Sequence, residues 1–128
     1  MKSKNALTYV AIGIVVVVIG GLFIIKRQGS PGPLDGLAQC IKDSGAVFYG
    51  AFWCPHCQSQ KKSFGRSEKY LPYVECSTPN GQGQTVACIE KKIESYPTWT
   101  FADGSTETGA LSIERLAEKT GCTLPPKL

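Results

Sequence analysis

A Cys-Pro-His-Cys motif, from Cys54 to Cys57, constrains the fold more than any other feature of the chain. It follows an apolar, strand-like run (46–52) and precedes a polar, helix-capable run (58–64). Cys54 is therefore expected where a strand ends and a helix begins, and Pro55 suits the first helical turn because its missing N–H has no partner there. Free N–H groups and the helix dipole favour an anion at that point, so a thiol pKa falls to roughly 3.5–7.5. Cys57 lies on the same helix face, and the two cysteines are predicted to form a reversible redox pair.

The N-terminal part of the chain contains an uncharged apolar run of twenty residues, 6–25. As a helix it would be about 30 Å long, which matches the hydrocarbon core of a bilayer. The following Ile24-Ile25-Lys26-Arg27 is a poor cleavage context, so an uncleaved transmembrane anchor is favoured over a cleaved signal peptide, with a buried soluble helix a distant third. The predicted organisation is a flank (1–5), the anchor (6–25), a Gly/Ser/Pro-rich linker (26–33) and a folded domain (34–128).

Charge and cysteine content indicate where the domain works. The four basic residues beside the apolar run account for the formal charge of +4, and they leave its orientation open. The rest of the chain has ten basic and ten acidic residues, so no nucleic-acid partner is expected. Six cysteines suggest disulfides, which persist outside the cytoplasm. These features predict a single-pass protein of the cytoplasmic membrane with its domain on the extracytoplasmic side.

Hydrophobic spacing predicts an α/β domain with the order helix, strand, helix, strand, helix, strand, strand, helix. The expected helices lie at about 34–44, 55–64, 86–93 and 113–120, and the expected strands at 46–52, 73–76, 98–101 and 106–108. The connections are long enough for the first three strands to be parallel, and the last two form a hairpin at Asp103-Gly104. Ser112 is a suitable N-cap for the last helix, and Gly121 would end it.

This order, with Cys-x-x-Cys at the first strand-to-helix junction, resembles the thioredoxin fold over roughly residues 34–122, with about four strands in a central mixed sheet. Trp53 directly before Cys54, and Pro97 just before the third strand, strengthen the resemblance. It implies that the Tyr96–Pro97 bond is cis and lies against the redox pair. The strings at 48–57, 72–76 and 93–99 resemble, more narrowly, the thioredoxin-like domain that accompanies vitamin K epoxide reductase homologues.

The resemblance implies a thiol–disulfide oxidoreductase that forms disulfides in secreted proteins and is reoxidised by a quinone-linked membrane partner, a vitamin K epoxide reductase homologue. The chain departs from the family pattern at Phe48, where many members carry a buried carboxylate that accepts a proton. No cofactor and no metal are expected. Cys54 and Cys57 could supply half of the ligands of a zinc site, but the sequence has no second Cys-x-x-Cys, and its one histidine lies inside the motif. The alternative functions are a reductase or isomerase, for example in cytochrome maturation, and a non-enzymatic, disulfide-stapled binding domain.

Cys54 is the expected nucleophile and Cys57 the resolving thiol. The expected active-site neighbours are Trp53, Pro55, His56, Tyr96, Pro97 and Thr98. His56 could donate to the Cys54 thiolate or attract it, although a plain surface role is also open. The Pro-His dipeptide occurs in the oxidising protein DsbA, so an oxidising potential is expected.

The other four cysteines are interpreted as structural disulfides. A Cys76–Cys88 bridge would clamp the turn-rich loop between them, and a Cys40–Cys122 bridge would tie the ends of the domain together. An electron relay through Cys76–Cys88 is a less favoured alternative, and spacing by itself allows three pairings.

Overall fold

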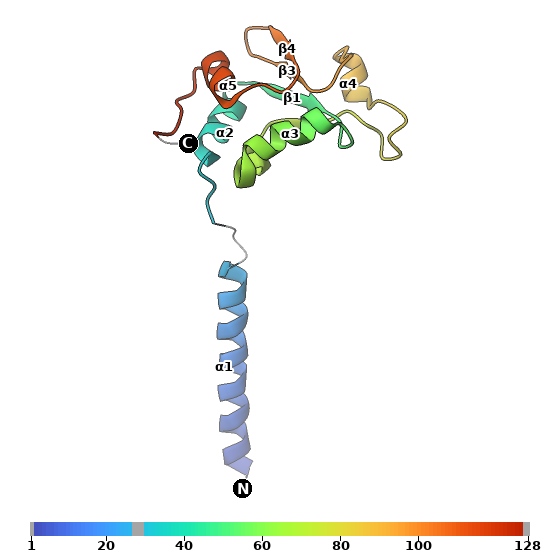
Figure 1. Cartoon of the computed structure of the whole chain (residues 1–128). Helices are drawn as coiled ribbons and strands as arrows, with labels where there is room; N and C mark the ends of the chain where they lie inside the picture. Colours follow the sequence, from blue (N-terminus) through green and yellow to red (C-terminus); the bar gives the residue numbers. More distant parts are fainter. Residues whose placement is uncertain (1, 27–29, 127–128) are drawn as a thin grey trace. The chain divides into compact units, whose positions relative to one another are not determined.

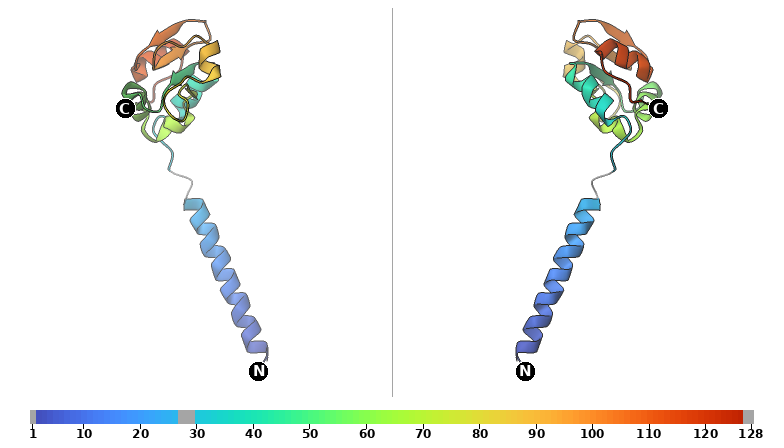
Figure 2. Two further views of the ribbon diagram at one scale, coloured as in Figure 1. Left: turned by 90° about the vertical axis from the view of Figure 1, so that its right-hand side faces the viewer. Right: turned by 90° about the vertical axis from the view of Figure 1, so that its left-hand side faces the viewer.

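A computed structural model describes residues 2–26 and 30–126, which divide into an N-terminal unit and a compact domain that begins at Pro31. The N-terminal unit is one continuous helix, α1 (Lys2–Lys26), shown in two views in Figure 2. Side chains from Asn5 to Leu22 are exposed, and in the described part of the chain only this helix is long and apolar enough to cross a membrane. Three residues of the predicted linker, 27–29, lie outside the described residues.

The domain follows the predicted order of elements, with shorter strands. Its helices are α2 (Asp35–Asp43), α3 (Pro55–Ser63), the 3₁₀ helix η1 (Gly65–Tyr70), α4 (Val86–Glu90) and α5 (Ile113–Thr120). Its strands are β1 (Val47–Gly50), β2 (Tyr73–Glu75), β3 (Thr98–Thr100) and β4 (Thr106–Thr108). Figure 1 shows α2 and α5 beside each other at one end of the sheet and α4 at the other. The predicted caps of α5 are confirmed: Ser112 Oγ accepts a hydrogen bond from the Arg115 N–H, and Gly121 ends the helix with φ of 68°.

The four strands form one mixed sheet in the order β2-β1-β3-β4. β1 and β2 are parallel, but β3 runs antiparallel to β1, so the prediction of three parallel strands was wrong. The register gives the reason. Glu75 at the end of β2 lies opposite Gly50, and Thr98 at the start of β3 lies opposite Tyr49, so the connecting segment stays at one end of the sheet. Connection length permits a crossover but does not require one.

A helix does begin at Val86, but its predicted extent to residue 93 and its predicted apolar buried face were wrong. α4 ends at Glu90, and its apolar side chains Val86 and Ile89 are 69% and 57% exposed. The residue that α4 buries is Cys88, which forms a disulfide with Cys76. A covalent bond to Cys76, the residue after β2, and not an apolar stripe, therefore sets which face of this short helix points inward.

Neighbouring residues of β1 contribute to two separate cores because successive strand side chains point to opposite faces. Phe48 lies in the main core, stacked on Trp99 with ring centroids 4.8 Å apart. Helices α2, α3 and α5 cover this face with buried residues that include Ile41, Cys57 and Leu116. Tyr49 lies in a second, smaller core with Cys76, Cys88 and Ile93.

Candidate functional site

Cys54 occupies the N-cap of α3. Its backbone is extended (φ −78°, ψ 119°), its carbonyl accepts the first helical hydrogen bond from the Gln58 N–H at 3.1 Å, and Pro55 fills the first helical turn. The structure thus places Cys54 where the free N–H groups of a helix favour a thiolate. Its side chain is 6% exposed, and its thiol donates to the Tyr96 carbonyl oxygen at 3.6 Å.

Cys57 lies one turn further along α3 and is 1% exposed. Both motif thiols are free in this structure, and Cys57 interacts with Cys54 through a side-chain hydrogen bond. Burial raises the pKa of the Cys57 thiol to about 12, against an opposing contribution from the Lys61 ammonium. Both cysteines are buried, but they differ in degree: Cys54 keeps 6% exposure, whereas Cys57 is enclosed and favours its neutral form.

Gly50, at the end of β1, contributes to the site in a way that the sequence did not suggest. A Cβ atom at this position would lie 2.9 Å from Cys57 Sγ and 2.8 Å from Tyr73 Cε2, closer than real Cβ contacts. The bare Cα lets the strand pass directly beneath the Cys57 sulfur. An isolated glycine in a strand can signal such a close approach, so the feature could have been read from the sequence.

The segment from Tyr96 to Thr98 lies against the motif. The Tyr96–Pro97 peptide bond is cis, and Pro97 is buried. Thr98 is buried at the start of β3, where its hydroxyl donates to the Ser95 carbonyl oxygen at 2.8 Å. The contact between Cys54 and the Tyr96 carbonyl brings this segment and the redox motif together from positions 42 residues apart.

Trp53 forms part of the exposed surface beside Cys54. It is half exposed, its indole N–H donates to Ser77 Oγ at 2.9 Å, and its ring meets the Tyr96 ring edge-on at 6.0 Å. This exposure is not that of a core-packing side chain. Phe52 is equally exposed, at 49%.

Pro55 and His56 are also exposed at the start of α3. Within the described residues, no hydrogen bond joins the His56 ring to Cys54. The proposed action of His56 on the thiolate therefore rests on its sequence position next to Cys54, and not on a contact.

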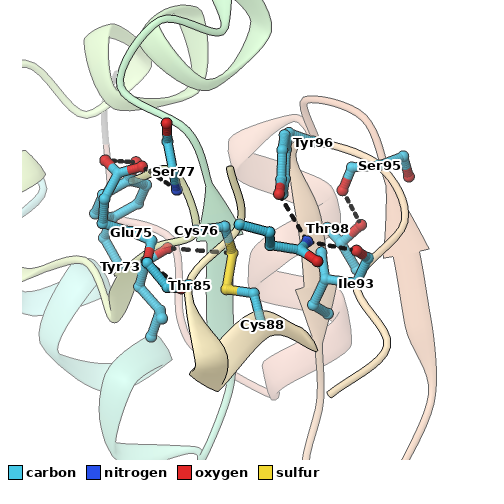
Figure 3. Close-up of a disulfide and its surroundings, with 12 residues drawn as sticks. Tyr73, Glu75, Cys76, Ser77, Thr85, Cys88, Ile93, Ser95, Tyr96 and Thr98 are labelled. Carbon is cyan, nitrogen blue, oxygen red and sulfur yellow. Dashed lines mark hydrogen bonds between the residues drawn. A yellow bond between two sulfur atoms is a disulfide. The ribbon is translucent and has the colours of Figure 1, made fainter. Parts of the chain in front are cut away.

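Glu75, at the end of β2, joins three parts of the site. One carboxylate oxygen accepts from the Phe52 N–H at 3.2 Å and from the Ser77 N–H at 2.9 Å, and the other accepts from the Tyr73 hydroxyl at 2.7 Å. Figure 3 shows the last two of these bonds beside the Cys76–Cys88 bridge. Sequence reasoning missed this residue, because nothing local distinguishes Glu75 from an ordinary surface carboxylate.

Tyr73 makes a cation–π contact with a lysine. The Lys61 ammonium of α3 lies 3.4 Å from the ring centroid, and the Phe48 ring meets Tyr73 edge-on at 5.0 Å. Burial, and then the adjacent Glu75 carboxylate, raise the pKa of the Tyr73 phenol, so Tyr73 remains a neutral hydrogen-bond donor.

The remaining cysteines form the pairs favoured by the sequence analysis. Cys40 is joined to Cys122, and Cys76 to Cys88. Both cysteines of the second bridge are completely buried, and Gln84 donates to the Ile93 carbonyl and the Tyr96 hydroxyl, both at 2.7 Å.

Taken together, these contacts define a dithiol site: a cysteine with slight exposure at a helix N-terminus, a more deeply buried partner cysteine one turn later, and a cis-proline segment against the first. Such an arrangement is suited to thiol–disulfide exchange, since one sulfur can be attacked and the other can leave.

We also compared the chain with known proteins. No family model matches the chain. The chain is similar to the thiol-disulfide oxidoreductase LTO1 of Arabidopsis thaliana, with 44% identity over 105 residues that cover 78% of this chain. The match spans only 27% of the plant protein, about a quarter of its length.

Proposed function

We propose that the protein is a membrane-anchored thiol–disulfide oxidoreductase of the thioredoxin fold that forms disulfides in extracytoplasmic proteins. The observation that carries this proposal is the asymmetric pair Cys54/Cys57 at the start of α3. The similarity to a thiol-disulfide oxidoreductase supports the same chemistry.

The proposed reaction transfers two electrons from a protein dithiol to the oxidised pair. A substrate thiolate attacks Cys54 Sγ, the Cys54–Cys57 bond breaks, and its electron pair remains on Cys57 Sγ, which takes up a proton. A second substrate thiolate then attacks the substrate sulfur of the mixed disulfide and releases Cys54 as a thiolate. The substrate gains one disulfide, and the enzyme is left as the dithiol. Trp53, His56, Tyr96, Pro97 and Thr98 form the surface on which this exchange would take place.

The location and partner of the enzyme are part of the proposal. The two further disulfides in the domain support an oxidising compartment, and α1 is suited to hold the domain at the membrane. Turnover needs an acceptor for the two electrons, which we propose is a quinone-linked membrane protein of the vitamin K epoxide reductase type, on the resemblance of the strings at 48–57, 72–76 and 93–99.

The test uses the full chain in detergent micelles. The oxidised protein should introduce disulfides into a reduced, unfolded model protein, and its potential against glutathione should lie well above that of thioredoxin, which is about −270 mV. Cys54→Ser should lose the reaction. A potential near that of thioredoxin would favour the reductase alternative, and binding that survives Cys54→Ser would favour the binding-domain alternative.

A further inference from the structure

Lys61 lies on the same face of α3 as Cys57, one helical turn later. Side chains four residues apart on a helix are neighbours, and the charge of Lys61 acts on the Cys57 sulfur in the direction that favours a thiolate. Lys61 is only half-buried, so its ammonium keeps contact with solvent and its charge costs little desolvation. A cation is thus positioned beside a buried sulfur.

Tyr73 fixes the position of that cation. The Lys61 ammonium lies over the ring face at 3.4 Å, and a cation prefers this face because the ring quadrupole is negative there. The ring itself is held on three sides, by the Phe48 edge contact, by the hydroxyl bond to Glu75, and by the close approach to Gly50. The Cε2 edge of Tyr73 and Cys57 Sγ lie side by side over the bare Cα of Gly50, so one rigid ring contacts both the strand and the lysine.

Among the described groups that act on the charge of Cys57, Lys61 supplies the positive one. Cys54, on the same helix, disfavours a Cys57 thiolate, as would any negative neighbour. Glu75 lies at the hydroxyl end of Tyr73, and its oxygens are occupied by three donors. On β1, Phe48 lies in the same core as Cys57, and it is apolar and stacked on Trp99.

We propose that Tyr73 holds the Lys61 ammonium beside Cys57 so that this charge stabilises the negative charge developing on Cys57 Sγ when it leaves. The inference rests on the proposed function and deepens it. In the step concerned, a bond forms between the substrate sulfur and Cys54, the Cys54–Cys57 bond breaks, and Cys57 departs with the electron pair before taking a proton from water. Lys61 is a charge-stabilising residue for this departure, and Tyr73 is its positioning residue.

This role predicts a kinetic effect without an equilibrium effect. At neutral pH the reduced product carries Cys57 as a protonated thiol, so Lys61 stabilises the transition state more than either end state. Lys61→Met should therefore slow attack by a small thiol on the oxidised protein roughly three- to tenfold, the range expected for one partly exposed charge. The equilibrium constant with glutathione should stay within about twofold of the unmodified protein.

The experiment measures the rate of reduction of the full chain in detergent by dithiothreitol, followed through Trp53 fluorescence, at low and high salt. Lys62→Met is the matched control, because Lys62 is the adjacent, exposed lysine of the same helix. The expected result is a slow Lys61→Met variant, with Lys61→Arg and Lys62→Met within about twofold of the unmodified protein and a smaller difference at high salt. Tyr73→Leu should slow the reaction as well, and its effect should not add to that of Lys61→Met.

Three outcomes would overturn the inference: equal rates for Lys61→Met and Lys62→Met, equal slowing by Lys61→Met and Lys61→Arg, or a rate change matched by a change in the equilibrium constant. Each leaves the proposed function intact, because the unmodified protein still reacts. If the unmodified protein does not exchange with the thiol while Cys54 is intact, the proposed function itself has failed.

Discussion

Two cysteine pairs lie at the same end of the sheet and differ in how they meet solvent. In the Cys54/Cys57 pair, Cys54 keeps 6% exposure and directly follows the exposed Trp53, and Cys57 is 1% exposed. In the Cys76–Cys88 pair, both residues are 0% exposed and lie with Tyr49 and Ile93 in the second core.

The difference shows what makes a cysteine pair reactive. Exchange requires that an external thiolate reach one sulfur in line with the other, and of these two pairs only the first keeps any exposure, at Cys54. Burial of both sulfurs, as in the second pair, leaves a bridge that constrains the chain. The five predictions below test this contrast, in order of decreasing expected effect.

The largest effect is expected from Cys54→Ser. A hydroxyl cannot form the mixed disulfide, so thiol–disulfide exchange should fall by about 10³-fold or more, as for loss of a covalent nucleophile. The measurement is the rate of disulfide formation in a reduced model protein. Retention of a tenth of the activity would show that Cys54 is not the attacked sulfur.

The second prediction concerns the double variant Cys76→Ala/Cys88→Ala. The bridge closes a loop with a sequence separation of 12, so its loss should lower the free energy of unfolding by about 3 kcal/mol in the chain-entropy model. Urea unfolding monitored by tryptophan fluorescence measures this, and the exchange rate per folded molecule should be unchanged. A fall in the exchange rate per folded molecule would instead support the electron-relay interpretation of Cys76–Cys88.

Gly50→Ala is expected to disturb the reactive pair through the backbone. The new Cβ would press on Cys57 Sγ and Tyr73 Cε2, so the free energy of unfolding should fall by about 1–3 kcal/mol. Gly36→Ala is the control, since that glycine lies in α2 with no atom near its missing Cβ, and alanine there should stabilise the helix by up to about 1 kcal/mol. Equal effects of the two substitutions would refute the close approach of β1 to Cys57.

The raised pKa of Cys57 predicts a loss of stability at alkaline pH in the reduced protein. The thiol is neutral in the folded state up to about pH 12, whereas in the unfolded chain it ionises from about pH 9. Between these values the unfolded state holds fewer protons, so the free energy of unfolding should fall by about 1 kcal/mol per pH unit. Denaturant titrations at several pH values measure this slope, and Cys57→Ser should lack that part of it.

The smallest effect is expected at Lys92, which follows α4 and the second pair. Its φ of 55° is a left-handed conformation that glycine adopts without cost, so Lys92→Gly should stabilise the domain by up to about 1 kcal/mol. Lys91→Gly is the control, because Lys91 has a right-handed backbone (φ −84°) and glycine there should give no gain. If Lys91→Gly stabilised the domain more than Lys92→Gly, the assigned end of α4 would be contradicted.

Local sequence signals were enough to predict the Cys54/Cys57 site. The apolar run before Cys54, Pro55 after it, Ser112 and Gly121 each act through their own backbone or their immediate neighbours, so a single stretch of sequence carries the signal. The α/β class and the order of the elements followed from such local signals, as did the position of the motif at the start of α3.

The direction of β3 and the buried face of α4 were not predictable in this way. Both depend on where the segment after β2 travels, and neither the length of a connection nor the spacing of apolar residues fixes that path. The contact of Glu75 with Phe52 and that of Lys61 with Tyr73 were missed for the same reason, since each joins two separate segments of the chain.

The sequence by itself determined that two thiols would meet at a helix N-terminus, in a domain that follows an apolar helix in the chain, because spacing and capping act over a few residues. Only the tertiary structure decided which groups surround those thiols: Gly50 beneath Cys57, the Tyr96 carbonyl beside Cys54, and the Tyr73 ring that holds Lys61. These contacts join residues far apart in the chain, and packing of the sheet against α3 brings them within reach of the two sulfurs.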